Sequence, residues 1–232
     1  MVSVDTVYQR VLALANKEQR GYISPIKFNL FANQAQMDIF EQYFYDRNQF
    51  GRVSGNSTMY GDPVDILEEK IEIFHTQETL EDNTNPSNIF NLNDLSNTYY
   101  RLASVLHENV KVEKLVYSKY CLVSNSPLTA PTKTRPVYFL QDTTITASPE
   151  TVTSIDVNYI RKPADVNWSG INVNGSLVYS GNGTNFELHV SEETKLVVKI
   201  LQLAAIEMKD DGLAALALRE DKKKIFNKKN NN

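Results

Sequence analysis

The chain has 232 residues, of which 41% are hydrophobic and 22% are charged, and this globular composition excludes wholesale disorder. Its net charge of −4 excludes a general affinity for nucleic acid. Cys121 is the single cysteine, which excludes an internal disulfide. No apolar run is long enough to predict a membrane span. Asp5 and Arg10 interrupt the apolar run that a signal peptide needs, so we expect synthesis and assembly in a reducing cytoplasm.

Two helices are expected near the start of the sequence. Apolar residues recur at helical spacing in the first of them, which predicts a helix over 4–18. Ser24 and Pro25 are suited to be the N-cap and the first residue of a second, longer helix, because serine accepts a backbone hydrogen bond and proline has no backbone donor to lose. Gly51 supplies the stop for this helix.

The second helix carries a row of apolar and aromatic side chains, which includes Phe28, Phe40 and Tyr43. The row follows an i, i+3, i+4, i+7 course, and Asn29 and Asn33 lie elsewhere on the helix. Basic residues are scarce here, so we expect core or a subunit interface rather than a platform for stacking bases. A Gly/Ser/Asn-rich segment follows, and Asp62-Pro63 opens a third helix.

β structure is expected in the middle of the chain. Residues 76–97 are rich in Asn, Thr, Asp and Pro and predict a loop with one short strand at 89–92. A strand at 100–106 and a short helix at 114–122 come next. β-branched and aromatic runs between prolines then predict a small sheet from strands at 137–140, 143–146 and 153–160.

Asn174-Gly175 is the strongest hairpin signal in the chain, because both turn positions favour positive φ. A further strand is expected over 181–190. Ser191 has the features of an N-cap for a long helix, with Glu192 and Glu193 at its positive end. Asp211-Gly212 permits a break before a second terminal helix, whose apolar residues extend around more than one face.

These elements predict an α+β fold. The N- and C-terminal helices form a bundle, and a small antiparallel β domain is inserted between them in the sequence. We expect a helical region with a flexible loop at 1–97 and a β-rich insertion at 98–190. Residues 191–232, with their basic tail, would complete the helical region.

No catalytic, cofactor or metal site is expected. His75, His107 and His189 fall on three different elements, and with one cysteine they make no zinc motif. A Cys121–His107 nucleophile and base is conceivable, but buried single Cys and His residues are far more common than catalytic pairs. Phosphate-loop, dinucleotide and nucleophile-elbow motifs are absent from the sequence.

The stretch "VNYIRKPADVNW", residues 157–168, begins as an alternating strand and ends in a loop that holds the only tryptophan. Pro163 lacks a backbone donor and pushes Lys162 toward an extended conformation, so the default interpretation is a strand end. Arg161 and Lys162 at such an end can face a neighbouring molecule. Trp168 leaves a second interpretation open, because an exposed indole can stack on a sugar.

Two stretches carry a resemblance to a known family. "GYISPIKFNLFANQAQMDIFEQYF" near the start, and the Tyr-x-Arg-Lys-Pro corner with Trp168 after it, resemble segments of structural proteins of tailed bacteriophages. The order of parts, with a β insertion between helical regions, is similar to that of neck adaptor or ring proteins of podovirus-like virions.

The resemblance implies a noncatalytic head-to-tail connector protein of the virion, assembled in the bacterial cytoplasm. Such a protein forms a ring of about twelve copies below the portal, contacts the portal and adjacent neck or tail proteins, and lets DNA pass without specific binding during genome ejection; no membrane is involved. A tail-tube component or a host-surface or glycan-binding module is the alternative. The candidate assembly residues are Arg161, Lys162, Pro163, Trp168, Leu213, Leu216, Lys222, Lys223, Lys224, Ile225 and Phe226.

Overall fold

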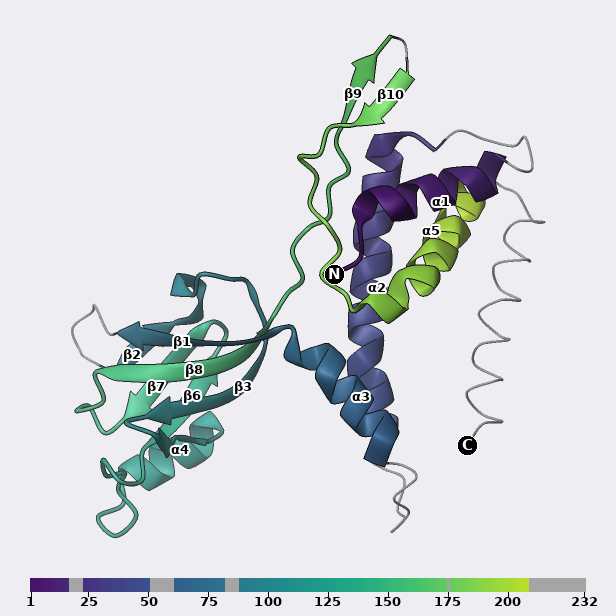
Figure 1. Ribbon diagram of the computed structural model, residues 1–232. Coiled ribbons are helices and arrows are strands. Elements are labelled where there is room, and N and C mark those ends of the chain that lie inside the picture. The colour runs from purple at the N-terminus through teal and green to yellow at the C-terminus, as the bar shows by residue number, and fades with distance from the viewer. Residues whose placement is uncertain (17–22, 51–60, 82–87, 175, 209–232) are drawn as a thin grey trace. The chain divides into compact units, whose positions relative to one another are not determined.

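The computed structural model describes residues 1–16, 23–50, 61–81, 88–174 and 176–208, and its helices and antiparallel sheets give an α+β protein (Figure 1). The chain divides into two compact units. Unit 1 comprises Met1–Ile73 and the chain from Pro163 onward, and unit 2 comprises Phe74–Lys162. In the part that the structure describes, no helix combines the length and the apolar character needed to cross a membrane.

Unit 1 contains the helices α1 (Val4–Asn16), α2 (Pro25–Phe50), α3 (Gly61–Glu72) and α5 (Glu193–Met208). α2 contacts both α3 and α5, and α1 contacts α5. α2 begins as expected, because the Ser24 hydroxyl accepts the backbone N–H of Lys27 at 3.5 Å. The predicted packing role of its aromatic row is confirmed for the fully buried Phe28, Phe40 and Tyr43.

A two-stranded ribbon also belongs to unit 1. β9 (Gly170–Val173) and β10 (Ser176–Tyr179) pair antiparallel, with Ile171 directly opposite Val178. Asn174 in the turn has φ of 51°, so the predicted hairpin is confirmed.

Unit 2 is built from two sheets with one shared core (Figure 1). The first sheet has the order β1-β8-β3-β4, from β1 (His75–Glu81), β8 (Ser154–Arg161), β3 (Tyr99–His107) and β4 (Val110–Lys111). The second has the order β2-β7-β6-β5, from β2 (Ile89–Asn91), β7 (Thr144–Ser148), β6 (Val137–Gln141) and β5 (Glu113–Lys114). β5 runs parallel to β6, and the other neighbours are antiparallel. The short helix α4 (Tyr117–Ser124) contacts β6.

The core of unit 2 explains the alternation of its strands. β8 buries every second residue, including Ile155, Val157 and Tyr159, and β7 buries Ile145 and Ala147 from the other sheet. Burying each large side chain stabilises the unit by about 1.5–3 kcal/mol. The strands expected at 89–92, 100–106, 137–140, 143–146 and 153–160 are confirmed, with bounds that differ by at most two residues.

Three sequence-based expectations are wrong. Residues 76–81 are not loop but belong to strand β1, which is polar because it lies at a sheet edge and buries only Leu80. The strand expected over 181–190 is not formed, since Thr184 and Phe186 make only isolated bridges, to Asn167 and Val2. Ser191 does not cap the long helix, because a 3-10 turn, η3 (Val190–Glu192), precedes α5.

The compact units have bounds that differ from the ranges 1–97, 98–190 and 191–232. β1 pairs with β8 from His75 to Glu81, and this pairing draws the segment after Ile73 into the β unit. The segment after Pro163 instead packs with the helices of unit 1, where Trp168, Phe186 and Leu188 are buried.

Candidate interaction surfaces

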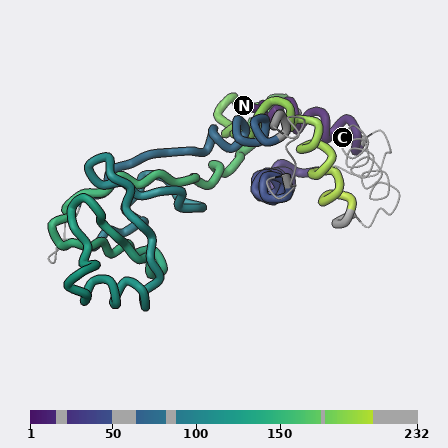
Figure 2. Tube along the Cα trace, turned by 90° about the horizontal axis from the view of Figure 1, so that it is seen from below, coloured from purple at the N-terminus to yellow at the C-terminus, as the bar shows by residue number. Residues whose placement is uncertain are grey.

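The Arg-Lys-Pro corner is the place where the chain leaves unit 2. Arg161 ends β8, as the proline predicted, and its backbone N–H donates to Phe74 O at 2.9 Å. The Lys162 N–H donates to Thr98 O at 2.9 Å, and its side chain is exposed. The segments at Phe74 and Arg161 thus run side by side, as Figures 1 and 2 show.

The guanidinium of Arg161 is partly held within its own unit. Its Cζ lies 5.7 Å from the centroid of the Phe74 ring, which is cation–π distance. Lys162 therefore offers the more accessible cation of the corner. The other side of the corner, Pro163, is buried.

Trp168 is a core residue of unit 1, with 2% of its surface exposed. Its ring lies 4.4 Å from that of Tyr8 and 5.9 Å from that of Tyr179, measured between centroids. The indole Nε1–H donates to Asp5 Oδ1 at 2.9 Å. A buried indole has no face to offer a sugar, so Trp168 does not support a glycan-binding role.

A ladder of side-chain amides holds the segment before Trp168 against α2. Asn29, Asn33 and Gln36, at i, i+4 and i+7, take the place of a paired strand. Asn33 Nδ2 donates to Val166 O at 3.0 Å, and its Oδ1 accepts the Val166 N–H at 2.6 Å. Asn29 makes the same two bonds with the backbone of Trp168, at 3.1 and 2.8 Å, and Gln36 Nε2 donates to Ala164 O at 2.8 Å.

Sequence reasoning missed this ladder because it placed Asn29 and Asn33 outside the packing face. Amides at i, i+4 and i+7 beside an aromatic row are the signal that could have found it. Each asparagine satisfies both the donor and the acceptor of an extended backbone, which would otherwise be left unpaired on burial.

A polar cluster joins α2, α3 and η3, the turn before α5, in unit 1. Lys70 Nζ lies 2.6 Å from Glu192 Oε1, with side chains only 18% and 8% exposed. Lys70 also lies 5.8 Å from the centroid of the Tyr43 ring. Burial, and then the charge of Glu192, raises the pKa of Tyr43, so its hydroxyl stays protonated. This cluster fixes α2, α3 and η3 to one another.

The histidines and the cysteine form no recognisable centre. His107 is buried in unit 2 with Nδ1 2.8 Å from Ser154 O, and His189 caps η3. Cys121 is half-buried on α4, where a hydrogen bond with it raises the pKa of Tyr117. Among the residues described, no three His, Cys, Asp or Glu side chains are grouped in a way that could hold a metal ion.

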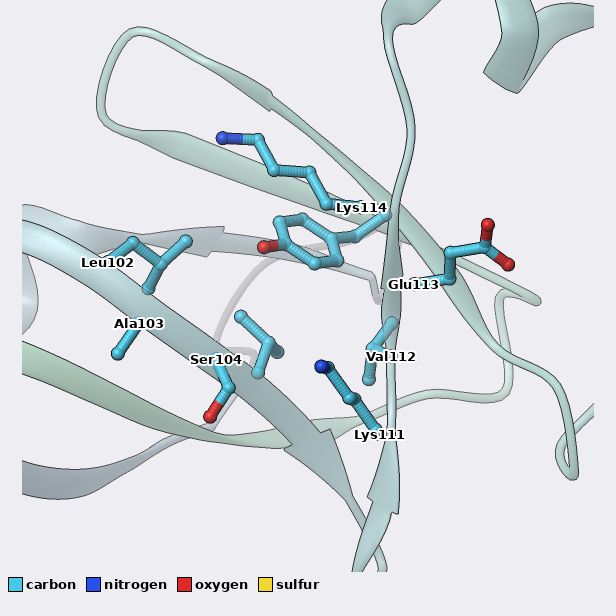
Figure 3. Close-up of a pocket in the computed structure, with 9 residues that line it drawn as sticks. Leu102, Ala103, Ser104, Lys111, Val112, Glu113 and Lys114 are labelled. Carbon is cyan, nitrogen blue, oxygen red and sulfur yellow. The ribbon is translucent and has the colours of Figure 1, made fainter. Parts of the chain in front are cut away.

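A shallow pocket of about 500 Å³ opens in unit 2 beside β3. The buried Val105 and Val112 line it together with Leu102, and the exposed Lys111 and Lys114 lie on its rim. Figure 3 shows Lys114 extending beside the pocket and Glu113 pointing away from it. Burial raises the pKa of Tyr138, whose ring also lines the pocket, so its hydroxyl is a neutral partner for an incoming group.

Apolar side chains are exposed on the β9–β10 ribbon. Ile171, Val173 and Val178 share one face of it and are 55%, 45% and 48% exposed. No charged residue occurs between Asp165 and Glu187. Exposed apolar residues grouped in this way indicate a surface that another molecule covers.

Of the candidate assembly residues, Arg161 and Lys162 lie at the end of unit 2, Pro163 begins the second segment of unit 1, and Trp168 lies in the core of unit 1. The remaining candidates, Leu213, Leu216, Lys222, Lys223, Lys224, Ile225 and Phe226, lie outside the described residues. No protein-family model matches the chain, and no curated protein matches its sequence.

Proposed function

We propose that the chain is a noncatalytic virion protein of a tailed bacteriophage, which forms a ring of identical copies in the neck below the portal. It joins the capsid to the tail around the DNA exit channel. The N- and C-terminal helices act as one bundle that faces the portal, with the β unit as its insertion. The terminal segment from Ser191 to Phe226, with its basic end, is the portal-docking or ring-forming element of this proposal.

The observation that carries the proposal is the apolar ribbon β9–β10. A hairpin of two strands is at best marginally stable in water, and this one exposes three β-branched side chains on one face. A protein that works alone in solution gains nothing from such an arm. In an assembly protein, such a ribbon can bind a neighbouring molecule. We propose that the uncharged ribbon binds an adjacent neck or tail protein.

The arrangement of titratable groups also supports a structural role. The Lys70–Glu192 pair fixes helices, and His107 is bonded to a backbone carbonyl. The open pocket beside β3 presents lysines on its rim, which suits recognition of an acidic group better than acid/base chemistry.

A double substitution in the ribbon tests the proposal. Ile171→Thr with Val178→Thr keeps β-branched residues at an opposed pair, so the hairpin should survive while its apolar face is lost. We expect virions that carry the variant to lose tail attachment, whereas Asn172→Thr on the other face should leave it intact. Normal tails on particles with the double variant would count against the proposal.

A further inference from the structure

Basic residues gather on one part of unit 2. Segments 111–119 and 133–135 contain five lysines and arginines and one acid, and all five cationic side chains are exposed. Two backbone hydrogen bonds join the first segment to the residues directly after the second, from Glu113 N–H to Pro136 O at 3.0 Å and from Leu115 N–H to Tyr138 O at 2.8 Å. The protein as a whole is acidic, so this concentration of positive charge is local.

Exposed apolar side chains lie among these cations. Val116 is the N-cap of α4, and Lys119 and Leu122, three positions apart, are neighbours on the helix surface. Val116 and Leu122 are 68% and 73% exposed. We name Lys114, Val116, Lys119 and Leu122 the basic face.

α4, which carries part of the basic face, packs against β6. The rings of Tyr117 and Tyr120 lie 5.2 and 4.5 Å from the ring of Phe139 on β6, which fixes α4 to its sheet. The pocket rimmed by Lys111 and Lys114 adjoins it. A surface that combines cations with aliphatic groups suits an acidic protein surface better than nucleic acid, whose interfaces are more polar.

A surface of the opposite character lies on α3 and on Ile73, the residue that follows it, in the same chain. Asp65, Ile66, Glu69, Glu72 and Ile73 are exposed and follow an i, i+1, i+4, i+7, i+8 course, which makes one continuous stripe. The opposite side of α3 buries Leu67 and Ile71. The acidic stripe therefore carries three carboxylates and two isoleucines.

We propose that the basic face of one copy docks on the acidic stripe of a second copy of this chain, an inference that rests on the proposed ring of identical copies. Both the charges and the apolar groups match, and the pocket beside β3 gives room for an isoleucine of the stripe. A contact between two different faces of one chain is heterologous, and it is the kind of contact from which cyclic rings are built. Opposite charges also speed the encounter of copies and make it sensitive to salt.

Charge reversal tests this contact. Variant A carries Lys114→Glu and Lys119→Glu, and variant B carries Glu69→Lys and Glu72→Lys. The full chain is studied by sedimentation velocity and mass photometry over a range of concentrations and salt. Wild type should form multimers as concentration rises, and A or B alone should assemble at least about tenfold more weakly because like charges then meet. An equimolar mixture of A and B should assemble again, since each reversed face finds its complement.

Glu41→Lys with Glu81→Lys changes the net charge as variant B does but lies off the stripe, and this control should assemble like wild type. Circular dichroism checks that every variant is folded. A wild type that stays monomeric at every concentration, or an A and B mixture that fails to assemble, overturns the inference. A further variant carries all four reversals in one chain. If this variant recovers the wild-type fold stability but stays monomeric, the two faces contact each other within one chain, and the inference is overturned.

DNA fragments and anionic lipid vesicles are tested with wild type and variant A. Binding that is lost in variant A, with self-assembly unchanged, would assign the basic face to that ligand instead. The proposed function is judged separately: a virion without a ring of this chain refutes the function, whereas a ring that forms normally from variant A refutes the contact alone.

Discussion

Replacing Trp168 with alanine should strongly destabilise unit 1. The side chain is 2% exposed and packs on the Tyr8 ring, so its removal leaves a cavity that costs about 3–5 kcal/mol. Its bond to Asp5, whose carboxylate can regain water, adds about 1 kcal/mol. We expect a total of about 4–6 kcal/mol, which is comparable to the lower end of the usual stability of a whole domain.

Urea denaturation followed by far-UV circular dichroism measures this loss, because the substitution removes the only tryptophan and with it the fluorescence probe. Trp168→Phe keeps most of the ring contact and should cost about 1–2 kcal/mol. Asp5→Asn, which retains an acceptor oxygen, should stay within about 0.5 kcal/mol of wild type, and Asp5→Ala should lose about 1 kcal/mol. A Trp168→Ala variant as stable as wild type would refute the assignment of Trp168 to the core.

Other parts of the two units give further predictions. Glu192→Gln should cost about 2–3 kcal/mol in thermal unfolding, because it breaks the buried pair with Lys70, whereas Glu193→Gln, which loses only an exposed pair, should cost less than about 1 kcal/mol. Gly170→Ala should cost about 1–3 kcal/mol by urea titration, because a Cβ there would lie 2.6 Å from the Trp168 ring; no loss would argue against this packing. Partial burial acts to raise the pKa of Glu78, but hydrogen bonds from Ser96, Tyr159 and Asn97 outweigh it and lower the pKa. The stability that Glu78 contributes is therefore fully present above its ordinary pKa and is lost as the pH falls through the lowered value. In Glu78→Gln, the free energy of unfolding should therefore fall less steeply with decreasing pH in the acid range than it does in wild type.

Local signals in the sequence predicted much of the fold. Ser24-Pro25 and Asn174-Gly175 fix a helix start and a hairpin through the conformations of their own residues, and both predictions are confirmed. Alternation also predicted β8, because every second residue enters the core. In these cases the residues that determine a helix start, a turn or a strand lie within that element or next to it.

Features that depend on distant residues could not be predicted in the same way. β1 is polar and forms because β8 supplies its hydrogen bonds across the sheet. The amides of Asn29 and Asn33 bond to backbone more than 130 residues away, which no local pattern reveals. The lysines near α4 can be seen in the sequence, but the hydrogen bonds that gather their segments on one surface cannot.

The Arg161-Lys162 corner keeps part of its predicted role. Its strand end is confirmed, and Lys162 is exposed where the chain leaves unit 2. Trp168 is buried in the core of unit 1 and does not form part of an exposed contact surface. A contact of Lys162 with a neighbouring copy remains a prediction, which Lys162→Glu tests in the same sedimentation assay.

Image reconstruction of virions that contain this chain tests the central claim most directly. We expect a closed ring of identical copies around the DNA exit channel below the portal, with the basic face of each copy against the acidic stripe of the next. A chain that is absent from the neck, or that occurs there as separate copies without contact, would contradict it.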